Sequence, residues 1–154
     1  MKHLGDPAVR EEIAQRIANV LPDSGAAWGR MTAPQMLCHL TDSYRVGMGE
    51  KSASPASGFL PQSFLKWMAL RFPAPWPRGV ATRPEVEQGP GGGGTPPGDF
   101  ERDRAELLAV VRNFSNPERT FSWHPHPAFG PLTEWEWMRW GYLHADHHLR
   151  QFGV

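Results

Sequence analysis

The sequence predicts an all-α fold, namely an irregular four-helix bundle formed by a single domain over residues 1–154. Start and stop signals of helices divide the 154-residue chain into four segments of roughly 15 to 20 residues each. Alternating apolar and polar patterns, which are typical of strands, are missing throughout. About fifty residues rich in proline and glycine separate the second and third predicted helices, so the bundle needs one long crossover connection.

The first predicted helix is DPAVREEIAQRIANVL, residues 6–21. Asp6 is a favoured N-cap residue, and Pro7 is tolerated at the first helical position because its missing N–H would have no partner there. Pro22 is expected to end the helix. Apolar side chains recur at helical spacing, at Val9, Ile13, Ile17 and Val20.

The second predicted helix is TAPQMLCHLTDSYRVGMG, residues 32–49. Thr32 and Gln35 form a capping box, and Pro34 is tolerated in the first turn. The third predicted helix covers residues 99–114. The fourth, TEWEWMRWGYLHADHHLRQF, covers residues 133–152 and begins with a second capping box, formed by Thr133 and Glu136.

The crossover contains PQSFLKWMALRF, residues 61–72, for which we expect a short extra amphipathic helix. It also contains QGPGGGGTPPGD, residues 88–99, which lacks the Gly-Lys-Ser/Thr ending of a phosphate-binding loop. We interpret this glycine run as a flexible linker. Residues 89–98 are therefore predicted to be poorly ordered and replaceable by another linker of similar length.

Composition excludes several classes of protein. The 16 basic and 16 acidic residues cancel, which gives no support to a nucleic-acid or anionic-membrane partner. Cys38 is the single cysteine, so an internal disulfide and a cysteine-rich zinc module are excluded. The longest apolar stretch, residues 58–72, is too short and too charged to span a bilayer. The N-terminus lacks an apolar leader, and we expect a cytoplasmic protein.

Three of the seven histidines lie in one five-residue stretch, residues 144–148, inside the fourth predicted helix. At about 100° per residue, Arg139, Asp146 and Arg150 group together and predict the solvent face. His144 and His148 lie on the opposite side, which they share with Trp137 and Gly141, whereas His147 lies nearer the rim with Trp140. Two imidazoles at i and i+4 on a buried face are close enough to hold one cation.

The second predicted helix adds a third imidazole. His39 lies on the inward face of this helix, in a stripe that consists of Met36, His39, Leu40, Ser43 and Gly47. The rest of the helix surface is formed by Cys38, Thr41, Asp42 and Arg45. His39, His144 and His148 therefore form a candidate three-histidine site for a divalent metal. Such a set leaves coordination positions for water or substrate, as in catalytic sites.

The other candidate ligands are given different roles. Cys38 lies about 100° round the helix from His39 and is expected to be a small packed residue. His124 and His126 lie on a proline-bounded loop, where surface or turn roles are favoured. His3 is close to the N-terminus and receives no role.

Several stretches then resemble a bacterial family of domains of unknown function within the DinB/YfiT-like superfamily of metalloenzymes. The resemblance covers residues 10–152 and is most specific in WGRMTAPQMLCH, residues 28–39, and in HADHHLRQF, residues 144–152. It implies a four-helix bundle with a divalent metal on three histidines, at positions that match His39, His144 and His148. Homodimers are common in the superfamily, and some members are thiol-dependent transferases. HPAFG, residues 126–130, has Ala128 where the family tends to have an aromatic residue, so a pocket capped by this loop would be wider.

The leading interpretation is a metal-dependent enzyme, either a hydrolase or a thiol S-transferase, acting on an unidentified small molecule. The residues that could orient the imidazoles through hydrogen bonds are Asp42, Gln35 and Gln151. An apolar substrate pocket could be lined by Trp137 and Trp140. Imidazole suits zinc, nickel and iron alike. The alternative is a non-catalytic metal- or ligand-binding stress protein, in which His147 or a carboxylate closes the site. A third interpretation is that the imidazoles pack without any metal.

Overall fold

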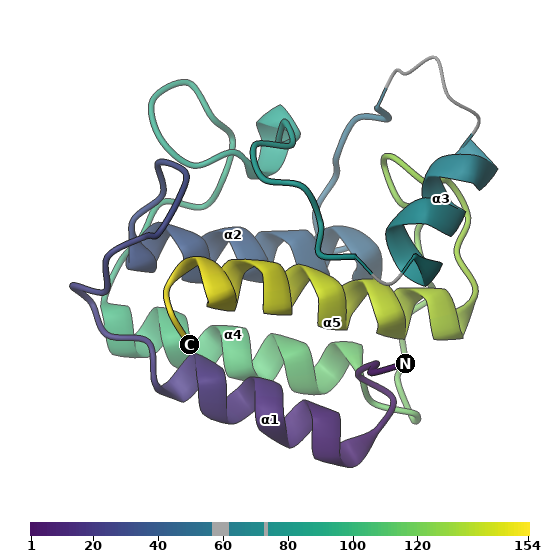
Figure 1. Ribbon diagram of the computed structural model, residues 1–154, viewed down its shortest axis with the longest axis horizontal. Coiled ribbons are helices and arrows are strands. Elements are labelled where there is room, and N and C mark those ends of the chain that lie inside the picture. The colour runs from purple at the N-terminus through teal and green to yellow at the C-terminus, as the bar shows by residue number, and fades with distance from the viewer. Residues whose placement is uncertain (57–61, 73) are drawn as a thin grey trace.

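The computed structural model describes residues 1–56, 62–72 and 74–154, and within these ranges every regular element is a helix (Figure 1). An isolated backbone pairing between His126 and Gly130 is the nearest approach to a strand there. The all-helical class predicted from the sequence is therefore confirmed. The elements in chain order are α1 (Pro7–Ala18), α2 (Ala33–Met48), α3 (Gln62–Arg71), the 3-10 turn η1 (Pro84–Val86), α4 (Phe100–Phe114) and α5 (Glu134–Gln151).

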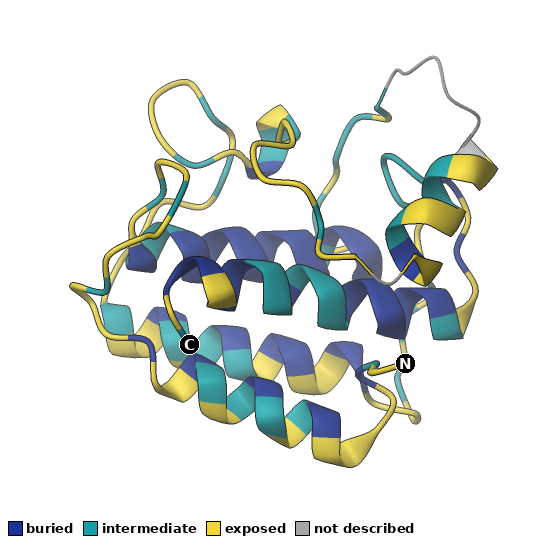
Figure 2. Cartoon of the chain, in the orientation of Figure 1, coloured by how far each residue is buried: buried dark blue, intermediate teal, exposed yellow. Residues whose placement is uncertain are grey.

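The four longer helices pack around one core. Both α2 and α1 contact α4 and α5, while α3 contacts α5 and η1 contacts α2. The crossover that carries α3 and η1 lies over α2 and α5, on the side away from α1 (Figure 1). Figure 2 shows that the buried residues line the facing sides of the four longer helices. No helix in the described ranges combines the length and apolar character needed to cross a membrane.

Local capping explains where the helices begin. Asp6 accepts a hydrogen bond from the backbone N–H of Ala8 at the start of α1. Both predicted capping boxes are present, at the starts of α2 and α5. The end of α1 differs from the prediction, because the helix ends at Ala18 and does not continue to Pro22. Arg104 of α4 donates to the carbonyls of Ala18 and Val20, which gives partners to C-terminal carbonyl groups that the shorter helix leaves free.

Two glycines on the inward faces allow α2 and α5 to pack closely. A Cβ atom at Gly47 would lie 2.9 Å from the Trp137 ring. A Cβ at Gly141 would lie 2.8 Å from Leu4, and the carbonyl of Gly141 accepts a hydrogen bond of 2.7 Å from the Tyr44 hydroxyl. The sequence had placed both glycines on the faces that carry the histidines, and this placement is confirmed.

The predicted solvent face of α5 is covered in part. Arg139 is only 8% exposed, because the N-terminal residues and the end of α3 lie over it. It donates to the carbonyls of Leu70 and Lys2, at 3.1 and 2.7 Å. Asp146 is half-buried against Arg16 of α1. The prediction that this whole face meets solvent was therefore wrong. The periodicity of one helix contains no information about which segments pack on it.

The glycine-rich segment also departs from its prediction. Asp42 of α2 is fully buried, and its carboxylate accepts from the backbone N–H and the hydroxyl of Thr95, at 2.7 and 2.8 Å. Lys51 donates to the same carboxylate and to the carbonyl of Gly93. The segment is thus held against α2 by specific hydrogen bonds and is not the poorly ordered linker that we expected. The short helix predicted within residues 61–72 is confirmed as α3, although residue 61 lies outside the described residues.

Replacing Gly92 with alanine is expected to destabilise the fold. A Cβ there would lie 2.1 Å from the carbonyl oxygen of Glu87, so the backbone that follows η1 would have to shift. Strain of this kind typically costs about 1–3 kcal/mol of unfolding free energy. Urea unfolding measures the loss, with Gly25→Ala as the matched control because nothing lies within 4 Å of that position. Equal stability of the two variants would contradict the close approach.

Candidate metal centre

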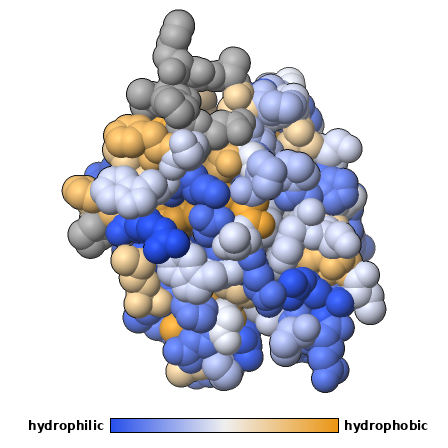
Figure 3. Space-filling view, turned by 90° about the vertical axis from the view of Figure 1, so that its right-hand side faces the viewer, coloured by the Kyte–Doolittle hydropathy of each residue, from blue (hydrophilic) through white to orange (hydrophobic). Residues whose placement is uncertain are grey.

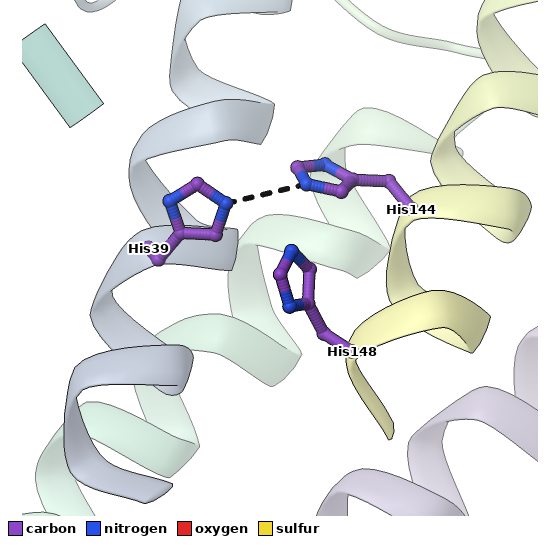
Figure 4. A group of neighbouring side chains, drawn as sticks. All are labelled: His39, His144 and His148. Atoms are coloured by element: carbon purple, nitrogen blue, oxygen red, sulfur yellow. Dashed lines mark hydrogen bonds between the residues drawn. The ribbon is translucent and has the colours of Figure 1, made fainter. Parts of the chain in front are cut away.

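Three imidazoles from two helices meet inside the molecule. His39 lies on α2, and His144 and His148 lie one turn apart on α5 (Figure 4). Each offers one ring nitrogen, and the three nitrogens all lie within 4.8 Å of one another. The Nε2 atoms of His39 and His144 are 3.3 Å apart. The structure therefore brings together the three histidines that the sequence selected.

Burial keeps these imidazoles neutral. His39 and His148 are buried, and His144 has intermediate exposure, with its Nδ1 atom inaccessible to solvent. Desolvation lowers the pKa of His39 and holds the pKa of His144 well below its usual range, while it lowers the pKa of His148 to about 3. A neutral imidazole is the protonation state that binds a metal ion.

The tautomer of His148 is set by a relay of hydrogen bonds. The side-chain amide of Gln151 donates from Nε2 to the backbone carbonyl of Trp28, at 2.5 Å. The amide oxygen of Gln151 then faces Nδ1 of His148, at 2.9 Å. An amide oxygen only accepts, so Nδ1 of His148 must carry the proton. Its Nε2 atom is left with a lone pair directed toward the other histidines.

The tautomer of His39 is set in the same way by backbone. Its Nδ1 atom lies 2.9 Å from the carbonyl oxygen of Val86, in η1. The carbonyl can only accept, so Nδ1 donates and Nε2 keeps its lone pair. Metal-binding histidines usually have such a partner on the second nitrogen, which fixes the ring orientation. Nδ1 of His144 has no partner among the described residues.

The geometry suits one small cation. The Nε2 lone pairs of His39 and His148 point into the same space, where two acceptors repel unless a cation or a donor lies between them. Two nitrogens bound tetrahedrally at 2.0–2.1 Å from one zinc ion would be about 3.3–3.4 Å apart. The 3.3 Å between His39 and His144 is compatible with that spacing. Within the described ranges no further His, Cys, Asp or Glu atom joins the group.

Of the three residues that were predicted to orient the imidazoles, one contacts a candidate metal-binding histidine and two do not. Gln151 bonds to His148, as expected. Gln35 is occupied in the capping box of α2, and Asp42 bonds to the crossover. Sequence reasoning missed Val86, because nothing in a short loop of prolines and charges indicates which carbonyl will lie over a histidine.

The aromatic surroundings also differ from expectation. Trp137 is 1% exposed and belongs to the core, so it does not wall a pocket. Trp140 is buried with its ring 4.9 Å from that of His144. Trp76, for which the sequence indicated no specific role, lies at the edge of the group, 6.1 Å from the His144 ring, and Trp28 lies 5.8 Å from the ring of the adjacent His147. Both come from loops, whose positions helical periodicity does not predict.

Cys38 stands apart from the histidines, as its position on the helix predicts. Its thiol contacts a carboxylate oxygen of Asp103 on α4, at 3.6 Å. Burial, followed by the charge of Asp103, raises the pKa of the thiol to about 12. A protonated thiol is neither a metal ligand nor a nucleophile.

His126 has the turn role that its loop suggested. Its Nδ1 atom accepts from the backbone N–H groups of Ala128 and Phe129, at 3.1 and 3.3 Å, and its ring stacks on Phe129. Desolvation lowers the pKa of His126 to about 3. His124 is exposed and its ring lies over Gly49.

Acid is therefore expected to weaken the fold through His126. The unfolded chain takes up this proton near pH 6.5 and the folded chain only near pH 3, so the stability is complete above pH 6.5 and is lost as the pH falls toward 3. Between about pH 7 and about pH 5 the loss is roughly 2 kcal/mol at most. His126→Asn keeps an acceptor for the two N–H groups without titrating. Urea unfolding at several pH values should show a shallower pH dependence for this variant; an unchanged dependence would contradict the assignment.

A family model described as a protein of unknown function, DUF1569, matches residues 12–153. No curated protein and no solved structure matches the chain.

Proposed function

This chain belongs to the DUF1569 family of proteins of unknown function, and from that premise we propose that it is a metal-dependent enzyme whose ion is held by His39, His144 and His148. One observation carries the proposal. The Nδ1 atoms of His39 and His148 donate to the Val86 carbonyl and to the Gln151 amide oxygen. The Nε2 lone pairs of the same two histidines therefore converge beside His144. The resemblance to DinB/YfiT-like four-helix metalloenzymes supports the same conclusion.

The reaction that we propose is hydrolysis or thiol S-transfer on a small molecule. A divalent ion held by three neutral imidazoles acts as a Lewis acid and lowers the pKa of a bound water or thiol. The histidines supply the binding site, and the carbonyls of Val86 and Trp28 hold two of them in place, the second through Gln151. Trp28 and Trp76 are the side chains that a substrate approaching past His147 would meet.

The alternative is a stress protein whose metal only holds helices together. That function needs a saturated site, with His147 or a carboxylate as the last ligand. The ring of His147 lies beside Trp28 and Trp76 and does not belong to the group of converging nitrogens. None of the described His, Cys, Asp or Glu side chains supplies a fourth ligand, which favours the enzyme.

Cobalt substitution tests the proposal. Protein purified without a histidine tag should contain one divalent ion per chain, and its cobalt form should have a visible spectrum that changes when azide, acetate or a small thiol is added. Because burial lowers the pKa of all three imidazoles, to about 3 for His148, the ion should stay bound at pH 6 and be released only as the pH falls toward that value. A cobalt spectrum that none of these ligands changes would support the structural function, and a chain that binds no ion would contradict both.

A further inference from the structure

A cavity of about 420 Å³ lies on the outer side of α5, and none of the three histidines lines it. Residues 1–2, 72 and 74–76 form its other walls. In Figure 3, which faces the side where α3 and the N-terminus lie, hydrophilic and hydrophobic side chains are intermixed. The lining is both cationic and apolar and includes Lys2, Arg139, Arg150, Trp76, Tyr142 and Leu143.

Arg139 is the unusual group in this cavity. Arg139 lines the cavity although the residue is only 8% exposed, and its two hydrogen bonds go to neutral backbone carbonyls. Within the described ranges it has no salt bridge to a carboxylate. The nearest acid in the lining, Asp146, is already paired with Arg16 and Arg150, each at 2.9 Å. An arginine stays protonated when buried, so this site contains a charge without a counterion.

A buried charge without a counterion is costly, and an anion in the cavity would remove that cost. The guanidinium has five N–H donors, of which two are used by the carbonyls of Leu70 and Lys2. The remaining donors suit the two oxygens of a carboxylate. Lys2 and Arg150 add positive potential, although each already has an acidic partner.

We propose that this cavity binds a small organic anion, in which a carboxylate pairs with Arg139 and an apolar body packs between Trp76 and Tyr142. The volume lies in the range that holds small organic ligands. The aromatic walls favour a flat or aliphatic body over an inorganic ion. Trp76 is shared with the metal centre, because its ring lies 6.1 Å from that of His144. A ligand here would thus touch the residue that flanks a proposed metal ligand without reaching the ion.

Calorimetry with defined probes tests this site. Benzoate and hexanoate are titrated into the full chain in parallel with benzamide and hexanamide, which keep the shape and lack the charge. At least one carboxylate should bind roughly tenfold or more tightly than its amide, because a charge-assisted hydrogen bond distinguishes them. Binding should persist in His39→Ala, so this site is tested separately from the metal centre.

Two variants separate binding from folding. Arg139→Gln should lose the preference for the carboxylate, whereas Arg112→Gln, on the exposed face of α4, should keep it. Arg139 also ties the N-terminus to α3, so Ala74→Trp supplies a second variant that fills the cavity and leaves Arg139 unchanged. It should abolish binding while the protein remains folded. Equal binding of acids and amides, no binding of either acid, or unchanged binding by Ala74→Trp would each overturn the proposal.

Discussion

Replacing His39 or His148 with alanine is expected to abolish stoichiometric metal binding. Each change removes one of three nitrogens that converge within 4.8 Å, and the described residues offer no His, Cys, Asp or Glu to replace it. The effect should be the largest of any substitution considered, because two imidazoles hold a divalent ion far more weakly than three. Metal content after dialysis, measured by mass spectrometry on tag-free protein, gives the result directly.

Three control variants make this experiment specific. His147→Ala removes the imidazole next in sequence to His148, and His3→Ala removes one near the N-terminus; both should keep the metal. Cys38→Ser should also keep it, because the thiol contacts Asp103. Metal retained by both ligand variants would refute the three-histidine site. Metal lost from His147→Ala would identify a fourth ligand and favour the structural function.

Substituting Gly29 or Gln151 should weaken the same site from a distance. Gly29 has a φ of +80°, which favours glycine, and a Cβ there would lie 2.5 Å from the amide nitrogen of Gln151. Gly29→Ala would push Gln151 away from the carbonyl of Trp28, and the proton on Nδ1 of His148 would lose its fixed acceptor. Losing a residue that orients a metal ligand typically lowers metal affinity about 10- to 100-fold.

Competition with a chelator measures this loss, and a double-mutant cycle shows its route. Gln151→Leu should lower the metal affinity to a similar degree, and adding Gly29→Ala to it should cost little more, since both act through one hydrogen-bond relay. Gly25→Ala, in the same loop but with no neighbour within 4 Å, should leave the affinity unchanged. Additive effects of the two substitutions would show that Gly29 does not act through Gln151.

Helical periodicity accounts for the part of the site that could be predicted. A residue's face on a helix depends on its neighbours in sequence, so His39, His144 and His148 could be assigned to the buried sides of two helices before any contact was known. The capping boxes of Thr32 and Thr133 are equally local, because three residues separate each pair of partners. These features follow from spacing within one turn or a few turns.

What lies over a helix depends on residues far away along the chain. Val86 reaches His39 across 47 positions, and Trp28 holds Gln151 across 123. Arg139 was assigned to the solvent face of its helix and Asp42 lay outside the inward stripe, yet both are buried by segments that helical periodicity does not include.

The sequence by itself thus determined the all-helical class, the helix starts and the inward direction of the three histidines, since these depend on short-range spacing. Only the tertiary structure decided which carbonyls fix two of the imidazoles, which tryptophans flank them and where an arginine has no counterion among the described residues. The physical reason is that loops have no periodicity, so their backbone polar groups find partners only once the helices have packed.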